Sequence, residues 1–213
     1  MKMIREFCAE NNTYLEKAIK AGVDRIELCD NLAVGGTTPS YGIIDQAAKL
    51  CQSTGVELSV MIRPRGGDFC YSEQELITMR IDILQAIKQG VTGIVFGCLT
   101  ADHQLDVQAC QYLMDGISNI DFTFHMAFDQ VDLSKKHQTL DKLIELGFDR
   151  ILLHGNRSDK TVIENADEIN HYIDYVADKL DIMVGGGITV ANLQEVAKAV
   201  RTNTFHGTKI VFL

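Results

Sequence analysis

Four side chains of this 213-residue chain could together carry acid–base chemistry. Glu6 or Glu27 could act as a general base and His125 as a general acid, while Arg63 could hold a negatively charged group. The alternative is a layer of salt bridges between Arg63 and the glutamates that fills the protein interior without chemistry, because buried charges need partners. The residue types alone leave both interpretations open.

A second set of residues could bind a small anion. The run MIRPRGGDFC carries Arg65 near its middle, and Asp68 could hold Arg65 in place or form a solvated ion pair with it. Backbone N–H groups in a glycine-rich turn before a helix often bind phosphate in barrel proteins, although any tight turn can use glycines for its geometry. The candidate anion site therefore consists of Arg65 with Gly185, Gly186 and Gly187.

The elements that must position these residues alternate between short β-rich runs and longer amphipathic ones. The expected strands are residues 4–8, 24–29, 56–63, 93–97, 121–128, 150–155, 181–186 and 204–208, with helical patterns between most of them. Ser72 and Glu75 have the spacing of a capping box, so a helix should begin there. Eight such repeats predict one α/β domain, residues 1–213, folded as a TIM-like (β/α)8 barrel of parallel strands; an open doubly wound sheet is the second choice.

The alternation of side chains along each strand predicts which residues face the barrel interior. Ile26 and Leu28 suit the side covered by helices, so the residues that follow each of them face inward. The same reasoning for the first, third and fifth strands gives an inward set of Glu6, Cys8, Glu27, Cys29, Arg63 and His125. We expect the two glutamates, the arginine and the histidine to form one buried network near the carboxyl ends of the strands.

The chain leaves little room for a helix after the eighth strand. The eighth helix is therefore expected to be short or missing, and the apolar residues 210–213 should lie uncovered. Exposed apolar surface of this kind usually marks an interface, so a homodimer is expected. The alternative is that another segment of the same chain covers the gap.

Composition excludes several classes of partner. A net charge of −9 and a pI of about 5.1 argue against binding to nucleic acid or to an anionic membrane surface. No apolar run approaches the roughly 20 residues of a membrane span, and the amino-terminal residues do not resemble a signal peptide. Six cysteines without a C-x-x-C pair, in a chain that does not resemble a secreted protein, are expected to be free thiols.

Four segments of the chain resemble the CutC family: residues 26–42, 61–72, 124–129 and 185–193. The resemblance implies a TIM-like barrel, a cytoplasmic location and a part in copper homeostasis, and it brings no established reaction. Two positions depart from the family pattern. Met126 stands where the family usually has arginine, and His154 stands where a small hydroxyl residue is usual.

The resemblance also implies a metal site, because copper binding in the family is linked to cysteines that match Cys8 and Cys29. Adjacent strands lie about 4.8 Å apart, so two inward thiolates could share one soft Cu(I) ion. His125 and His206 could add ligands. The alternative is that both cysteines are small buried fillers.

Three functions thus stay open from the sequence. The first is a copper-binding protein, and the second is an enzyme of unassigned reaction on a small anionic substrate at the barrel mouth. The third is a scaffold without catalysis.

Overall fold

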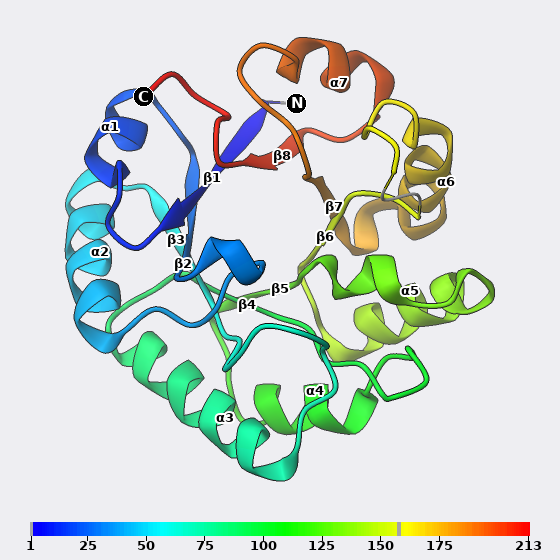
Figure 1. The fold of residues 1–213 in the computed structure, drawn as a ribbon, viewed down its shortest axis with the longest axis horizontal. Helices are drawn as coiled ribbons and strands as arrows, with labels where there is room; N and C mark the ends of the chain where they lie inside the picture. The colour runs from blue at the N-terminus through cyan, green and yellow to red at the C-terminus, as the bar shows by residue number, and fades with distance from the viewer. Residues whose placement is uncertain (1, 157–158) are drawn as a thin grey trace.

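The computed structural model describes residues 2–156 and 159–213, and its strands close into a barrel (Figure 1). Every neighbouring pair of strands is parallel, and β1 pairs with β8 to close the ring. The strands are β1 (Ile4–Glu10), β2 (Arg25–Cys29), β3 (Glu57–Met61), β4 (Gly93–Phe96), β5 (Asp121–Phe124), β6 (Arg150–Leu153), β7 (Asp181–Val184) and β8 (Thr204–Gly207). The expected TIM-like barrel is confirmed, and the open sheet is wrong.

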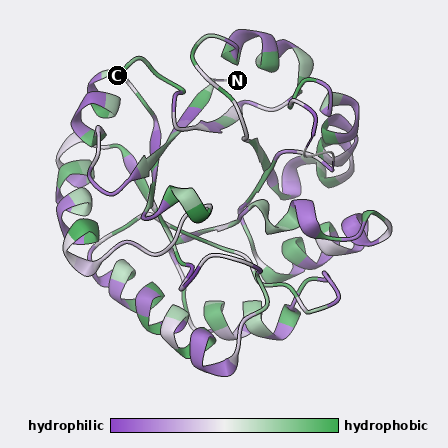
Figure 2. Ribbon diagram, in the orientation of Figure 1, coloured by the Kyte–Doolittle hydropathy of each residue, from purple (hydrophilic) through white to green (hydrophobic). Residues whose placement is uncertain are grey.

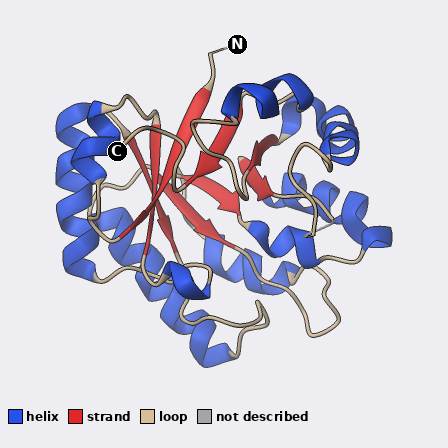
Figure 3. Ribbon diagram, turned by 45° about the horizontal axis from the view of Figure 1, so that its top comes forward, coloured by secondary structure: helices blue, strands red, loops and turns tan. Residues whose placement is uncertain are grey.

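Helices surround the ring of strands except between α7 and α1, where the segment after β8 is coil (Figure 3). The described residues form seven α-helices and no eighth one after β8, as expected: α1 (Leu15–Lys20), α2 (Tyr41–Thr54), α3 (Glu73–Lys88), α4 (Val107–Met114), α5 (Lys136–Leu146), α6 (Ala166–Val176) and α7 (Leu193–Ala199). The capping box is confirmed, since the Ser72 hydroxyl accepts from the Glu75 N–H and the Glu75 carboxylate accepts from the Ser72 N–H. Four 3-10 helices complete the list: η1 (Leu32–Val34), η2 (Met126–Gln130), η3 (Leu133–Lys135) and η4 (Ala177–Lys179).

Two separate groups of apolar side chains confirm the alternation along the strands. The larger group lies between the strands and the helices and includes Phe7, Ile26 and Leu28. A smaller group inside the barrel consists of Cys8, Cys29, Met61 and Val95, with Leu32 packed against it. The helices carry hydrophobic and hydrophilic residues in alternation along their length, as Figure 2 shows, which lets one side of each helix pack on the barrel.

The fifth strand is shorter than expected. It ends at Phe124, and Met126–Gln130 form the 3-10 helix η2. The reason lies in His125, which has extended backbone angles at the cap of η2 and accepts the Ala127 N–H at its Nδ1 atom, 3.2 Å away. This side-chain bond replaces a bond of the strand ladder and turns the chain.

The carboxyl-terminal segment is better covered than expected. Ile210 and Val211 are buried, and only Phe212 and Leu213 are exposed, by 80% and 45%. The segment is held because the Val190 N–H donates to the Lys209 carbonyl at 2.8 Å, which ties it to the connection between β7 and α7. The expectation that all of residues 210–213 lie uncovered is therefore wrong for the first two.

None of the helices in the described parts of the chain is long and apolar enough to cross a membrane.

Candidate metal centre

Two thiols and one carboxylate meet inside the barrel and form what we call the thiol–carboxylate cluster: Cys8, Glu27 and Cys29. Cys8 on β1 lies opposite Glu27 on β2 in the strand register, which brings their side chains together. Sγ of Cys8 lies 3.3 Å from Oε2 of Glu27, and Sγ of Cys29 lies 3.4 Å from the same oxygen. All three residues are buried, and Oε1 of Glu27 has no hydrogen-bond partner among the residues that the structure describes.

An imidazole and a second carboxylate lie against this cluster. Nδ1 of His206 on β8 is 2.8 Å from Oε1 of Glu6 on β1, and Nε2 of His206 is 3.7 Å from Oε2 of Glu27. Arg25 forms an ion pair with the other carboxylate oxygen of Glu6, with its Nη1 atom 3.2 Å from Oε2. The Nε atom of Arg25 forms a second ion pair, with Glu57. Ligand atoms of Glu6, Glu27 and His206 lie within 4.8 Å of one another, as do those of the thiol–carboxylate cluster, so Glu27 belongs to both groups.

Burial and neighbouring charges set the protonation of this interior. Burial raises the pKa of Glu27 well above its usual range; the charge of His206 opposes this shift, and the nearby Cys8 and Glu6 add to it. Burial acts on Glu6 in the same direction, but the hydrogen bond and charge of His206, together with Arg25, lower the pKa of Glu6 to about 2. Burial lowers the pKa of His206, yet Glu27, Cys8 and Glu6 raise it well above 6.5. At neutral pH we therefore assign a protonated Glu27, an anionic Glu6 and a cationic His206.

The two thiols differ in charge for a related reason. The hydrogen bond from Cys29 lowers the pKa of Cys8 well below 9.0 despite its burial, and charge and hydrogen bonding from His206 act in the same direction. The same bond, with burial, raises the pKa of Cys29. Cys8 is thus the thiolate of the pair, and Cys29 keeps its proton and donates it.

Arg63 and His125 form a different group, joined by the ring of Phe69. The Arg63 guanidinium lies 4.8 Å from the centroid of the Phe69 ring. The centroids of the Phe69 and His125 rings are also 4.8 Å apart. Within residues 2–156 and 159–213, no hydrogen bond or ion pair joins either residue to Glu6 or Glu27. The expected network is therefore divided in the structure.

His125 is not suited to act as an imidazolium acid. Burial lowers its pKa to about 3, with the Arg63 charge adding to the effect, so the ring is neutral near pH 7. Its Nε2 atom is buried without a partner.

A short segment covers the mouth of the barrel above the cysteines. We call residues 31–36 the lid; it contains η1, the blue helical turn near the centre of the ring in Figure 1. Leu32 of the lid packs against the apolar group inside the barrel to which Cys8 and Cys29 belong. Arg63 fixes the lid, since its Nη1 donates to the carbonyls of Val34 (2.8 Å) and Gly36 (3.0 Å).

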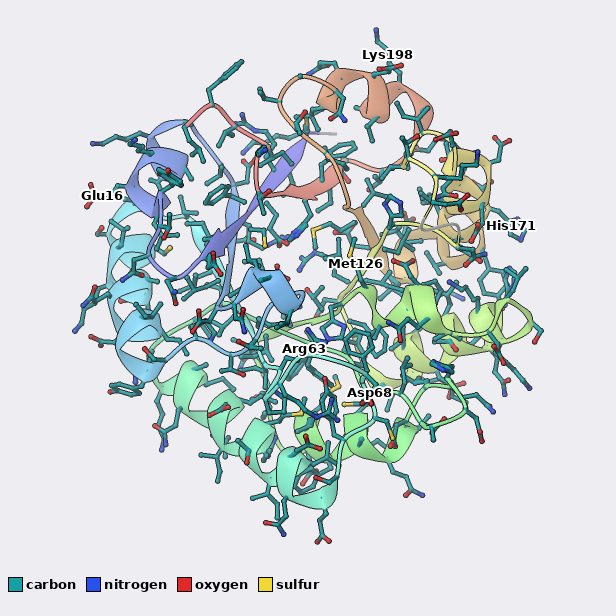
Figure 4. All side chains as sticks on the ribbon, viewed as in Figure 1. Glu16, Arg63, Asp68, Met126, His171 and Lys198 are labelled. Atoms are coloured by element: carbon teal, nitrogen blue, oxygen red, sulfur yellow. The ribbon has the colours of Figure 1, made fainter. Side chains whose placement is uncertain are left out.

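Two details show that the lid is fixed in place and lies close to the cysteines. A second donor of Arg63, Nη2, bonds to the Gly67 carbonyl at 2.7 Å, so the guanidinium joins the lid to the connection between β3 and α3 (Figure 4). Gly36 has a φ of +91°, and a Cβ atom there would lie 3.3 Å from Sγ of Cys29. Glycine therefore allows the lid backbone to lie directly on the sulfur.

The Arg65 side chain bonds to its own loop and to the first turn of α3. Its Nε donates to Glu75, its Nη2 to the Asp68 carboxylate at 3.0 Å and its Nη1 to the Gly66 carbonyl at 3.1 Å. Asp68 therefore forms an ion pair with Arg65, and both side chains of the pair are exposed, so this contact leaves the two alternatives for Asp68 open. With its donors used in this way, Arg65 fixes the start of α3, and none of the described contacts joins it to the glycine run.

The glycine run lies on the other side of the barrel. The Gly185 N–H donates to the Leu153 carbonyl, and the Gly187 carbonyl accepts from Asn192 at 3.0 Å. Gly186 lies against the His154 ring, where a Cβ would be 2.3 Å from Nδ1. A cavity of about 430 Å³ adjoins Gly186 and Gly187, and Lys160, Asn192 and Glu195 help to line it. Anion binding at the glycines stays a prediction, without Arg65 as a partner.

The two positions that depart from the family pattern also lie on this side. A Cβ at Gly185 would be 3.4 Å from the Met126 side chain, and His154 places Nδ1 3.1 Å from the Gly185 carbonyl and Nε2 2.7 Å from the Lys160 carbonyl. Both ring nitrogens of His154 therefore contact the protein itself. Met126 lies inside the ring of strands in Figure 4.

Sequence reasoning missed Arg25 entirely and considered His206 only as an added ligand. The alternation carries a signal for Arg25, because it stands two residues before the inward Glu27. For His206 the signal is weak, since its partner Glu6 is 200 residues away along the chain.

Comparison with known proteins identifies the family. The model of the CutC family matches residues 3–211. A protein of Streptococcus pyogenes named as a CutC family protein is 44% identical over 209 residues, which cover 98% of this chain and 100% of that protein. The chain belongs to the CutC family. The CutC resemblance seen in the sequence is thereby confirmed.

CutC proteins from other sources extend the match to structure and to a named role. A human protein named copper homeostasis protein cutC homolog is 40% identical over 203 residues, covering 95% of this chain and 72% of its own length. The crystal structure of CutC from Streptococcus agalactiae has a TM-score of 0.95 at 44% identity, over 98% of this chain and 100% of that one. The barrel described above is thus the fold of a CutC protein.

Proposed function

We propose that this barrel binds Cu(I) between Cys8 and Cys29 and acts in copper handling. Two observations support the proposal: the name carried by the human relative, and the two buried thiols that share one carboxylate oxygen. The second observation carries it, because soft thiolates select Cu(I) over harder ions. In this account copper is the cargo of the protein.

The protonation of the cluster suits the entry of a cation. Cys8 already favours the thiolate, while Cys29 and Glu27 keep protons that an ion would displace. The unpartnered Oε1 of Glu27 gives the buried carboxylate a free electron pair beside the sulfurs. Binding of Cu(I) should therefore release protons from Cys29 and Glu27, and the positive charge of the ion would offset part of the negative charge that their loss creates.

The lid limits how the ion enters. Cys29 is 1% exposed and Cys8 6%, and Leu32 packs over both. An ion can reach the sulfurs from the mouth only if the lid moves, so loading should be slower than diffusion to an open site.

A cytoplasmic location belongs to the same proposal. All six cysteines are free, and the two of the cluster must stay reduced to bind Cu(I) as thiolates. Cytosolic conditions keep thiols in that state.

Competition between the reduced protein and a Cu(I) chelator tests the ligands. Cys8→Ser and Cys29→Ser are expected to lower Cu(I) affinity by roughly a hundredfold or more, because each removes a thiolate ligand. Cys51→Ser is the matched control, since Cys51 is equally buried but lies on α2 in the outer group of apolar side chains. Equal affinity in the wild type and in both cluster variants would refute the proposal.

An enzyme acting on a small anion has less support. Arg65 is held by its own loop, and His125 is neutral near pH 7 because its pKa is about 3. Support for anion binding at the glycine run comes from the cavity that Lys160 and Asn192 help to line. None of these features brings a base, an acid and an anion ligand to one place.

A further inference from the structure

Two neighbouring helices bring two imidazoles together on the outside of the barrel. His137 is on α5 and His171 is on α6, and their Nε2 atoms lie 3.1 Å apart. The ring centroids are 5.1 Å apart, and the ring planes are inclined by 72°. Figure 4 places His171 on α6 at the rim of the molecule, away from the labelled residues at the centre of the barrel.

This distance fits two ligands of one metal ion. Imidazole nitrogens bind transition metals at about 2.0–2.1 Å, so two of them at angles of roughly 90–110° lie about 2.9–3.4 Å apart. The Nε2 atoms of His137 and His171 fall inside this interval. Both rings use Nε2, the nitrogen that lies farthest from the backbone, in this contact.

The surroundings hold one of the two rings in place before any ion arrives. His137 packs edge-on against Tyr175 at 4.5 Å and lies 5.7 Å from Tyr172. The Tyr175 hydroxyl is fixed in turn by the Asp141 carboxylate, at 3.0 Å from Oδ2. His171 is exposed and can adjust. One fixed ligand and one adjustable ligand reduce the ordering cost of binding.

Without an ion, the two rings are joined by a hydrogen bond between their Nε2 atoms, in which one nitrogen donates a proton to the other. A metal ion would replace that proton. Within the described residues, no third histidine, cysteine or carboxylate joins the pair in a group of possible ligands. The remaining coordination positions would therefore be open to water or to an external ligand.

We infer that His137 and His171 form a surface site for a divalent transition-metal ion, with Cu(II) bound most tightly. Imidazole suits copper, nickel and zinc, and the general affinity order places Cu(II) above the other two. The site is separate from the thiol–carboxylate cluster. It lies on different helices and strands, has different ligand atoms and would bind a different oxidation state of copper. An experiment can therefore refute one site without refuting the other.

Titration with Cu(II), followed by calorimetry and electron paramagnetic resonance, tests the site. The protein carries Cys8→Ser, Cys29→Ser and Cys70→Ser, which removes the two cluster thiols that would bind the ion and the exposed thiol that would reduce it. We expect one tight equivalent of Cu(II) with two nitrogen ligands. Adding His171→Gln should lower the affinity at least tenfold and remove one nitrogen, and adding His137→Gln should do the same.

Two controls make the result decisive. His103→Asn, which alters another exposed histidine, should leave Cu(II) binding unchanged. His171→Gln changes an exposed side chain, so its effect does not depend on a change in folding. Titration of the wild type and of His171→Gln with Ni(II) repeats the test with an ion that does not oxidise thiols. Unchanged Cu(II) and Ni(II) affinity in His171→Gln, or a loss of equal size in His103→Asn, would overturn the inference.

Discussion

At the scale of single residues, burial decides which side chains can carry charge. His125 illustrates this: its Nδ1 accepts the Ala127 N–H, its Nε2 has no partner, and its pKa is lowered to about 3 by burial and then by Arg63. In the unfolded chain the same ring has an ordinary pKa near 6.5. Between these two values the unfolded state binds the extra proton, so stability must fall as the pH drops from about 6.5 to about 3.

The variant His125→Asn tests this link between burial and pH. Asparagine can still accept the Ala127 N–H at the cap of η2, but it cannot titrate. Urea unfolding at pH 7 and pH 5 should show a smaller loss of stability in the variant than in the wild type. The difference is at most about 1.4 kcal/mol per pH unit, the effect of one proton. His103→Asn should behave like the wild type; an unchanged pH slope in His125→Asn would count against the neutral ring.

Residue types and alternation predicted much of the site. The inward phase of Glu6, Cys8, Glu27 and Cys29 follows from their apolar neighbours on each strand, and the structure agrees. The division of the expected network was not predictable in that way. Alternation gives the face of a strand on which Arg63 lies, but its carbonyl partners are on the lid, whose conformation has no strong sequence signal.

At the scale of elements, the lid depends on one guanidinium. Arg63 holds the carbonyls of Val34, Gly36 and Gly67 at once, and no other side chain could reach all three with a planar set of donors. Arg63→Met should therefore leave carbonyls without donors, at a cost of about 1–3 kcal/mol, and free the lid.

The reaction of Cys8, the thiolate of the pair, with a thiol reagent measures how often the lid opens. In a background with Cys70→Ser, which removes the exposed thiol, Arg63→Met should speed the labelling of Cys8 at least tenfold. Arg65→Met is the matched control, because the described contacts of Arg65 are with its own loop and with Glu75 on α3 and not with the lid. Equal labelling rates in Arg63→Met and Arg65→Met would mean that Arg63 does not control access.

The repeated elements could be predicted from the sequence, but the contacts between distant elements could not. The barrel and its missing eighth helix follow from eight alternating units, which is a repeated and therefore strong pattern. The pair of His137 and His171 had no such pattern, because it arises only when α5 and α6 pack side by side. Contacts between distant segments, such as Glu6 with His206, likewise need the closed ring.

At the scale of the whole molecule, the homodimer stays a prediction on a narrower basis. Ile210 and Val211 are covered, so the exposed apolar surface of the carboxyl terminus comes from Phe212 and Leu213 alone. The wild type should show the mass of a dimer by light scattering at micromolar concentration, and Phe212→Asp should shift it toward the monomer. Ile81→Glu, at an exposed apolar position on α3, is the comparison. A monomeric wild type would contradict the prediction.

The charge balance of the interior points to the same function as the two cysteines. The barrel buries Cys8, Glu6 and Glu27 with the cations Arg25 and His206, and it keeps protons on Cys29 and Glu27 that a bound ion can displace. X-ray absorption at the copper edge, on protein loaded with one equivalent of Cu(I), examines this centre most directly. We expect two sulfur atoms in the first coordination shell of the wild type and one in either Cys8→Ser or Cys29→Ser. A shell of nitrogen and oxygen alone, or two sulfur atoms in the double variant, would contradict the account.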